Sequence, residues 1–162
     1  MDSISIRPFE PEDRPGLIEL ARELQAAEAS FYDRMKAPEE IGDWYVDYLL
    51  EACEEDEGQI FVATDGDALV GYAAVLTKVS SEDAVDEIEH TYALVQDLAV
   101  SESFRGRGVG SQLLARSEDL ARAAGARWLR LWVLTENAPA VRVYEKTGFK
   151  SLFSVLEKPI DT

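Results

Sequence analysis

The sequence has almost no cysteine or histidine, which excludes several kinds of site. Cys53 is the only cysteine and His90 the only histidine among the 162 residues. A single cysteine cannot form a disulfide within the chain, and it cannot build a cysteine-based zinc site. A single histidine argues against a histidine-clustered metal centre. We therefore expect a function that uses no metal.

Long apolar runs are also absent. No stretch approaches the roughly 18 residues that are needed to span a bilayer. The first five residues, MDSIS, lack the basic-then-apolar order of a signal peptide. Apolar residues nevertheless make up 46% of the chain, which is enough for one continuous core. We expect one cytoplasmic domain over residues 1–162 with no membrane partner.

Basic residues are few relative to acidic ones, and the imbalance is confined to one half of the chain. The net charge is −16; residues 1–95 carry 24 Asp/Glu and 6 Lys/Arg, whereas residues 96–162 carry 8 and 10. Such an acidic chain repels nucleic acid, so no nucleic-acid partner is expected. The acidic half could attract a cationic substrate, and the other half could hold an anion. Adaptation to high salt explains the acidic residues equally well.

Hydrophobic periodicity and turn residues predict a mixed α/β chain, with helices packed on a mixed sheet. Strands are expected at 3–7, 59–63, 68–79, 92–100, 128–133 and 149–156, and helices at 13–27, 39–53, 109–124 and 137–147. In the strand at 92–100, strict alternation places Leu94 and Leu98 on one face, and Asp97 and Ala99 on the other.

A glycine-rich turn separates that strand from the helix after it. Three glycines alternate with other residues in the segment 105–110, and glycine permits positive φ and close backbone approach. Backbone amides at a helix N-terminus form an anion site, to which Arg105 and Arg107 add charge. The dinucleotide fingerprint is not met, because Ser111 occupies the place of its third glycine, and the lysine of a phosphate-binding loop is absent.

Two segments together resemble motifs of the GNAT superfamily of N-acetyltransferases. The segment 95–114, VQDLAVSESFRGRGVGSQLL, is similar to the acetyl-CoA-binding motif, whose core Gln/Arg-x-x-Gly-x-Gly/Ala is met by Arg105, Gly108 and Gly110. The segment 137–149, NAPAVRVYEKTGF, is similar to the family's second motif, Asn-x-x-Ala-x-x-x-Tyr-x-x-x-Gly-Phe. The resemblance implies the GNAT fold, a mostly antiparallel sheet of six to seven strands flanked by about four helices.

The resemblance also implies acetyl-CoA as the cosubstrate. In this family the strand before the glycine turn bulges and splays from its neighbour, and its backbone then pairs with the pantetheine arm. This assigns the arm to Leu98, Ala99 and Val100, with Asn137 either contacting its end or serving only as a helix cap. The amides that would hold the pyrophosphate belong to Arg105, Gly106, Arg107, Gly108, Val109, Gly110 and Ser111.

Tyr144 matches the usual general acid of the family. Since a phenol is a weaker acid than a thiol, we expect Tyr144 to stabilise the developing sulfur charge by a hydrogen bond, with concerted proton transfer. Asp97 is similar to the second acid of an acidic pair in polyamine and diamine acetyltransferases, although Gln96 replaces the first. Direct proton abstraction by Asp97 faces roughly six pKa units. We expect it to bind the ammonium or to orient a water chain, unless it is simply a polar residue at an edge-facing position.

The substrate pocket is expected between the first two helices and the central strands. Phe31, Tyr32, Trp44 and Asp97 are the predicted lining residues, although the aromatic side chains of the helix at 39–53 could equally be core. The predicted function is acetyl transfer by direct attack of a primary amine of a small, cationic acceptor. The alternatives are a non-catalytic acetyl-CoA-binding or sensor module, and an acetyltransferase of protein N-termini or lysines. The acceptor's identity and a homodimeric state are left open.

Overall fold

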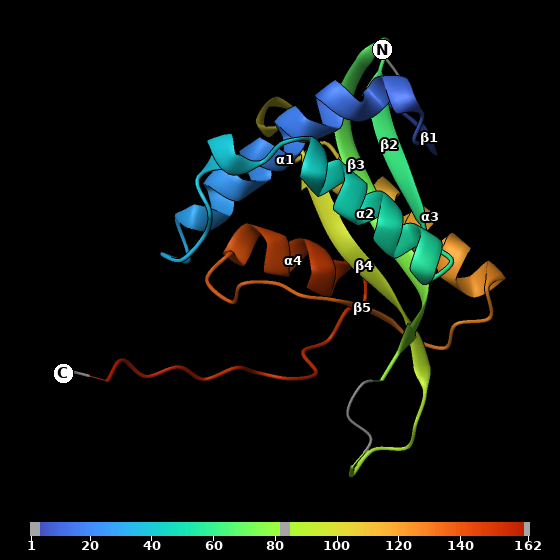
Figure 1. The fold of residues 1–162 in the computed structure, drawn as a ribbon, viewed down its shortest axis with the longest axis vertical. Coiled ribbons are helices and arrows are strands. Elements are labelled where there is room, and N and C mark those ends of the chain that lie inside the picture. The colour runs from blue at the N-terminus through green and yellow to red at the C-terminus, as the bar shows by residue number, and fades with distance from the viewer. Residues whose placement is uncertain (1–3, 82–84, 161–162) are drawn as a thin grey trace.

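The computed structural model describes residues 4–81 and 85–160 and contains one mixed sheet (Figure 1). Its strands, in spatial order, are β1 (Ser5–Pro8), β2 (Gln59–Asp65), β3 (Ala68–Ser80), β4 (Thr91–Val100) and β5 (Leu129–Leu131). Neighbouring strands are antiparallel except β4 and β5, which are parallel. The predicted mixed, mostly antiparallel α/β fold is confirmed. Residue 3 of the first predicted strand lies outside the described residues.

Helices cover both faces of this sheet. They are α1 (Arg14–Ala29), α2 (Asp43–Glu55), α3 (Val109–Ala123) and α4 (Ala138–Lys146). α1 and α2 share one apolar cluster with the sheet, whereas α3 packs in a second cluster on the opposite face (Figure 1). The predicted helix at 39–53 is in fact a short 3-10 turn at Pro38–Glu40 followed by α2. In the described part of the chain, no helix is long and apolar enough to cross a membrane.

The central strands are buried on both faces, which explains their nearly continuous apolar sequences. Leu17 of α1 and Leu49 of α2 are fully buried on one side, and Leu113 of α3 is fully buried on the other. α3 approaches the sheet closely at Gly71, where an added Cβ would lie 3.0 Å from the Ala99 carbonyl oxygen and 3.2 Å from the Leu113 side chain. The core therefore places the start of α3 directly against the end of β4.

A bulge interrupts β4 at Gln96. The register pairs Ala74 with Asp97 and Val75 with Val95, so Gln96 is an extra residue without a partner on β3. Side-chain alternation shifts by one at this point. Leu94 consequently packs in the α1–α2 cluster, while Leu98 packs in the α3 cluster. The prediction that Leu94 and Leu98 share a face is wrong for this reason.

β4 and β5 separate immediately beyond this bulge. Their pairing runs only from Ala93–Leu129 to Val95–Leu131. β5 ends there, but β4 continues to Val100. From Gln96 to Val100, the side of β4 that faces away from β3 has no paired strand among the described residues. The bulge and the splay expected from the family resemblance are therefore both present.

The predicted last strand at 149–156 is wrong. No strand occurs at residues 149–160, and the chain runs out from the sheet in an extended path (Figure 1). The sheet thus has five strands in the described part of the chain instead of six to seven. A strand needs a hydrogen-bonded neighbour, and this segment is paired with none of the five strands. Its apolar residues also come in adjacent pairs, 152–153 and 155–156, so neither face is purely polar.

Candidate functional site

The turn before α3 presents open backbone donors. Gly106 and Gly108 have φ values of 76° and 81°, in the left-handed region that favours glycine. A Cβ added at either position would meet nothing within 4 Å. Gly108 is the N-cap of α3, and no side chain caps the first turn of the helix. The amides of this turn therefore face open space at the positive end of the helix dipole, which suits an anion such as a diphosphate.

The two arginines of the turn are placed differently. Arg105 donates from Nε to the carbonyl oxygen of Val100 at 3.0 Å, which ties the turn to the end of β4. The Arg107 guanidinium lies 4.9 Å from the centre of the Phe104 ring. Both arginine side chains are exposed. Both guanidinium groups therefore add positive charge near the turn and leave its backbone amides open to an anion.

The unpaired edge of β4 leads directly into this turn. Leu98, Ala99 and Val100 lie on that edge, and the turn begins a few residues later. An extended arm that ends in phosphates fits this arrangement, since the edge can pair with amides of the arm and the helix N-terminus can hold the phosphates. Asn137 accepts from the Ala140 amide at 3.4 Å, which confirms its role as the cap of α4. Its contact with a cosubstrate stays a prediction.

Asp97 accepts hydrogen bonds from two tyrosines that come from different elements. Its Oδ2 lies 2.7 Å from the hydroxyl of Tyr45 on α2 and 2.6 Å from the hydroxyl of Tyr72 on β3. Burial raises the pKa of Asp97, and the two hydrogen bonds oppose that rise. Burial and the Asp97 charge raise the pKa values of Tyr45 and Tyr72, so both phenols remain protonated donors at neutral pH.

Tyr144 shares an electrostatic environment with two carboxylates. Burial, then the charges of Glu28 and Asp97, raise the pKa of Tyr144 to about 12. Glu28 is partly buried on α1, and burial together with Asp97 raises its pKa as well. The Tyr144 ring packs edge-on against Phe149, with ring centres 6.0 Å apart. The phenol on α4 thus interacts electrostatically with one carboxylate on α1 and one on β4.

Glu28 belongs to neither motif and to none of the predicted sites. It continues the i, i+4 series of Leu20 and Leu24 on the inward face of α1. A carboxylate within an apolar helix stripe is a sequence signal that points to Glu28. Tyr72 gives a similar signal, because it is a fully buried tyrosine within the apolar first part of β3, from 68 to 76.

The aromatic residues predicted to line the pocket lie at the surface of the α1–α2 region. Trp44 is 49% exposed and donates from its indole nitrogen to the Glu40 carbonyl oxygen at 2.7 Å. Tyr32 is 36% exposed and lies under the Arg34 guanidinium. Trp44 and Tyr48 are therefore too exposed to be core. Tyr48 accepts instead from the Gln96 side chain at 2.8 Å, so α2 contacts the bulge directly.

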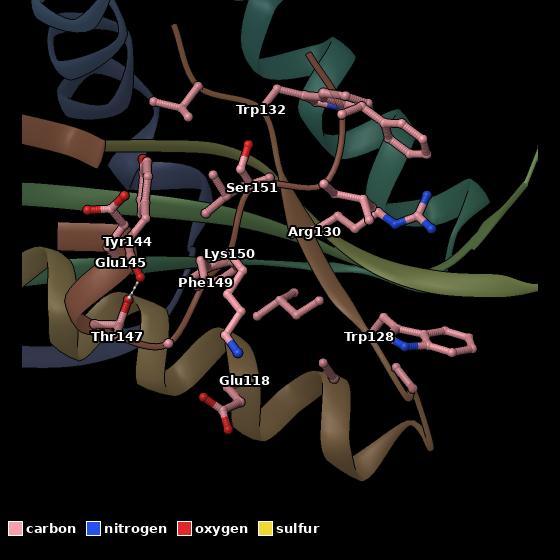
Figure 2. Close-up of a pocket in the computed structure, with 18 of the residues that line it drawn as sticks. Glu118, Trp128, Arg130, Trp132, Tyr144, Glu145, Thr147, Phe149, Lys150 and Ser151 are labelled. Atoms are coloured by element: carbon pink, nitrogen blue, oxygen red, sulfur yellow. Dashed lines mark hydrogen bonds between the residues drawn. The ribbon is translucent and has the colours of Figure 1, made fainter. Parts of the chain in front are cut away.

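A cavity of about 960 Å³ adjoins Tyr144. It lies between α3, β5, α4 and the segment that follows α4, and Tyr144 and Trp128 lie at opposite ends of it in the view of Figure 2. Aromatic side chains line much of it, including Trp132 and Phe149. Phe31, Tyr32, Trp44 and Asp97 are not among its lining residues. The structure therefore separates this cavity from the predicted acceptor residues.

Most of this chain matches the model of one known protein family. The model of the acetyltransferase (GNAT) family matches residues 18–149. The chain belongs to the GNAT acetyltransferase family. The matched region includes both motifs. It also includes most of residues 1–95, where the sequence agrees with the family only in the order of its helices and strands.

Several curated proteins are similar to this GNAT chain over part of their length. An uncharacterised N-acetyltransferase of Methanocaldococcus jannaschii is 27% identical over 90% of this chain and 60% of its own length. Mycothiol acetyltransferase of Corynebacterium glutamicum is 32% identical over 68% of this chain and 35% of its own. Streptothricin acetyltransferase of Streptomyces lavendulae is 35% identical over 59% and 47%. The chain thus spans about one third to three fifths of these relatives.

Solved structures agree with the GNAT fold. A mutant protein from Bacillus halodurans superposes with a TM-score of 0.85 at 18% identity, covering 96% of this chain and 99% of that one. An aminoglycoside N-acetyltransferase in complex with CoA superposes with a TM-score of 0.67 at 19% identity, covering 98% and 100%. At these identities the likeness concerns the fold alone.

Replacing Asp97 by Asn tests the electrostatic coupling within the site. Asp97→Asn keeps an oxygen that Tyr45 and Tyr72 can donate to, but it removes a negative charge near Glu28. The Glu28 carboxylate is then easier to form, so we expect the pKa of Glu28 to fall. Carboxyl-¹³C NMR titration measures this pKa. Glu51→Gln, an exposed change on α2, should leave it unaltered; an unchanged pKa in Asp97→Asn would contradict the coupling.

Proposed function

We propose that this GNAT protein transfers the acetyl group of acetyl-CoA to a primary amine of a small, cationic acceptor. The observation that carries the proposal is the unpaired edge of β4 running directly into the uncapped N-terminus of α3. Residues 1–162 act in this proposal as one acetyltransferase domain. The CoA complex of the aminoglycoside N-acetyltransferase with the same fold supports the choice of cosubstrate.

The cosubstrate is assigned to main-chain groups of this chain. The edge of β4 at Leu98, Ala99 and Val100 pairs with the pantetheine arm. The amides of the turn, at Arg105, Gly106, Arg107, Gly108, Val109, Gly110 and Ser111, hold the pyrophosphate. Three observations support the fit of these amides to a pyrophosphate: the left-handed conformation of the glycines, the open space around them, and the lack of a side-chain cap on α3. Main-chain recognition of this kind is insensitive to most side-chain changes.

The acceptor is assigned a positive charge because of the acids around Tyr144. Burial is the main cause of the raised pKa of Tyr144, and the charges of Glu28 and Asp97 add to it; the same two charges would favour an ammonium bound near this phenol. The net charge of residues 1–95 is −18, with 24 acidic and 6 basic side chains, and this field attracts cations. Phe31, Tyr32 and Trp44 are the residues assigned to the wall of the acceptor site. Relatives named for mycothiol and streptothricin support a small-molecule acceptor.

Bound acetyl-CoA supplies a thioester; the acceptor amine forms a new C–N bond with its carbonyl carbon as the C–S bond breaks. Tyr144 donates a hydrogen bond to the departing sulfur. With the phenol pKa near 12 and a thiol pKa of ~8.5, complete proton transfer costs about 5 kcal/mol, so the hydrogen bond stabilises the thiolate without full transfer. Asp97 and Glu28 hold the ammonium, which loses one proton through water before the attack; the nitrogen loses a second proton to water as the amide forms and the thiolate departs.

The direct test is release of CoA thiol in the presence of a panel of amines. Di- and polyamines, amino sugars and neutral monoamines are compared, and the cationic acceptors are expected to react faster. Acetyl-CoA binding without thiol release for any amine would favour a sensor module. Release only with peptides or proteins, identified by mass spectrometry of the acetylated product, would favour a protein acetyltransferase.

Removing the Tyr144 hydroxyl should affect turnover more than binding. We expect Tyr144→Phe to lower kcat about ten-fold or more because the leaving sulfur loses its hydrogen-bond donor. The dissociation constant of acetyl-CoA, measured by calorimetry, should stay unchanged. Tyr92→Phe is the matched control, since the Tyr92 ring stacks on Arg130 and keeps that contact without its hydroxyl. Normal turnover in Tyr144→Phe would remove this residue from the mechanism.

The two ends of α3 provide a matched test of the phosphate site. Gly108 and Gly125 have φ values of 81° and 79°, and a Cβ at either would meet nothing within 4 Å. Alanine at either position therefore costs similar backbone strain, about 1 kcal/mol or more, in urea denaturation. Only Gly108→Ala places a methyl group among the amides that hold the pyrophosphate. We expect at least ten-fold weaker acetyl-CoA binding for Gly108→Ala and normal binding for Gly125→Ala; equal affinities would exclude this phosphate site.

A further inference from the structure

Two tyrosine hydroxyls share a single oxygen of the Asp97 carboxylate. Both donate to Oδ2, at 2.7 Å from Tyr45 and at 2.6 Å from Tyr72. Tyr72 has no exposed surface, whereas Asp97 is only partly buried and can be reached by a ligand. In the described part of the chain, no side chain donates to the other oxygen, Oδ1. The carboxylate therefore has one oxygen that the phenols occupy and one that is open to a further donor.

The donors to Asp97 are neutral. Among the residues that the structure describes, no Lys, Arg or His forms a salt bridge with this carboxylate. A phenol stabilises an ionised carboxylate by donating a hydrogen bond, but it does not neutralise the charge. A partly desolvated carboxylate without a cationic partner gains free energy when a cation binds beside it. The cluster therefore favours a cationic ligand.

The titratable groups that interact with Asp97 come from every side of it. They are Glu28 on α1, Tyr45 on α2, Tyr72 on β3 and Tyr144 on α4. Burial raises the pKa of Asp97, and the hydrogen bonds from Tyr45 and Tyr72 lower it. If one of these donors were removed, burial would be opposed less, and Asp97 would take up a proton at a higher pH.

We propose that Tyr45 and Tyr72 are positioning residues of this acetyltransferase, which keep Asp97 ionised through Oδ2 and reserve its Oδ1 for the ammonium group of the acceptor. The inference rests on the proposed function, because it concerns the same amine at the same site. Neither tyrosine needs to contact the acceptor, since each acts through the carboxylate. The two donors come from different elements, α2 and β3, so the orientation of Asp97 depends on how the helix packs on the sheet.

A purely structural role is the competing interpretation. Tyr45 would then only join α2 to β4, as Tyr48 does by accepting from the Gln96 side chain at 2.8 Å. Tyr48 lies one turn after Tyr45 on the same helix. Tyr48→Phe removes a hydrogen bond between α2 and β4 without removing a donor to Asp97, so it is the matched control.

Carboxyl-¹³C NMR titration of the protein without ligands measures the pKa of Asp97, with Asp97→Asn to assign its signal. We expect this pKa to rise in Tyr45→Phe and in Tyr72→Phe, because each variant keeps the ring and removes one donor to the ionised form. It should stay unchanged in Tyr48→Phe. Urea denaturation establishes that each variant is folded. Tyr45→Phe, at the less buried position, keeps the test available if Tyr72→Phe does not fold. An unchanged Asp97 pKa in folded Tyr45→Phe would overturn the inference.

The pH profile of kcat/KM for a cationic amine tests the role of the cluster in the reaction. The fall at low pH reports protonation of the free enzyme, and it should begin at higher pH in Tyr45→Phe and Tyr72→Phe than in the wild type. In that pH range, the KM for the amine should be about ten-fold higher in these variants, because a neutral carboxyl binds ammonium weakly. The KM for acetyl-CoA and the profile of Tyr48→Phe should not change.

The two proposals fail in different ways. A wild-type protein that releases no thiol with any amine would contradict the proposed function. Active Tyr45→Phe and Tyr72→Phe variants whose profiles coincide with that of the wild type would overturn only the positioning role. Equal shifts in Tyr45→Phe and Tyr48→Phe would also overturn it, because they would trace the effect to the packing of α2 on β4.

Discussion

One extra residue in β4 determines the arrangement of the site. Gln96 is the bulge that places Leu94 and Leu98 on opposite faces, and the pairing of β4 with β5 ends just before it, at Val95 and Leu131. The bulge twists the strand, and the sheet opens beyond it. It also directs Asp97 toward α2 and the middle of the sheet, where two phenols bind it. The open edge of β4 and the placement of Asp97, which the proposed function assigns to the acyl carrier and to the amine, thus both occur at the same local irregularity.

The sequence predicts the parts of this site that depend on local backbone chemistry. A left-handed turn requires glycine, and Gly106 and Gly108 are visible as such in the sequence. The cap at Asn137 is visible for the same reason, because few residue types accept from a free helix amide. The order of helices and strands can also be predicted from hydrophobic periodicity. Alternating segments indicate strands, and apolar stripes at i, i+4 spacing indicate helices.

Features that depend on distant partners could not be predicted. Bulge position is set by the pairing of β3 with β4, so strict alternation gave Leu98 the wrong face. Glu28 acts on Asp97 and Tyr144 only because α1 packs against β3 and β4. The segment at 149–156 has the composition of a strand, but it pairs with no strand of the described fold. In each case the missing information is which segments lie side by side, and propensity does not contain it.

The two tyrosines of α2 bear on how new acceptors could be accommodated. Tyr45 donates to Asp97 and Tyr48 accepts from Gln96, so α2 is held to β4 by hydrogen bonds that do not involve the loop that precedes it. The loop after α1, with Tyr32 and Arg34, can therefore change in length or sequence while the carboxylate keeps its position. Divergence of specificity would then be concentrated in residues 30–40, and the chemistry itself would be shielded from that drift.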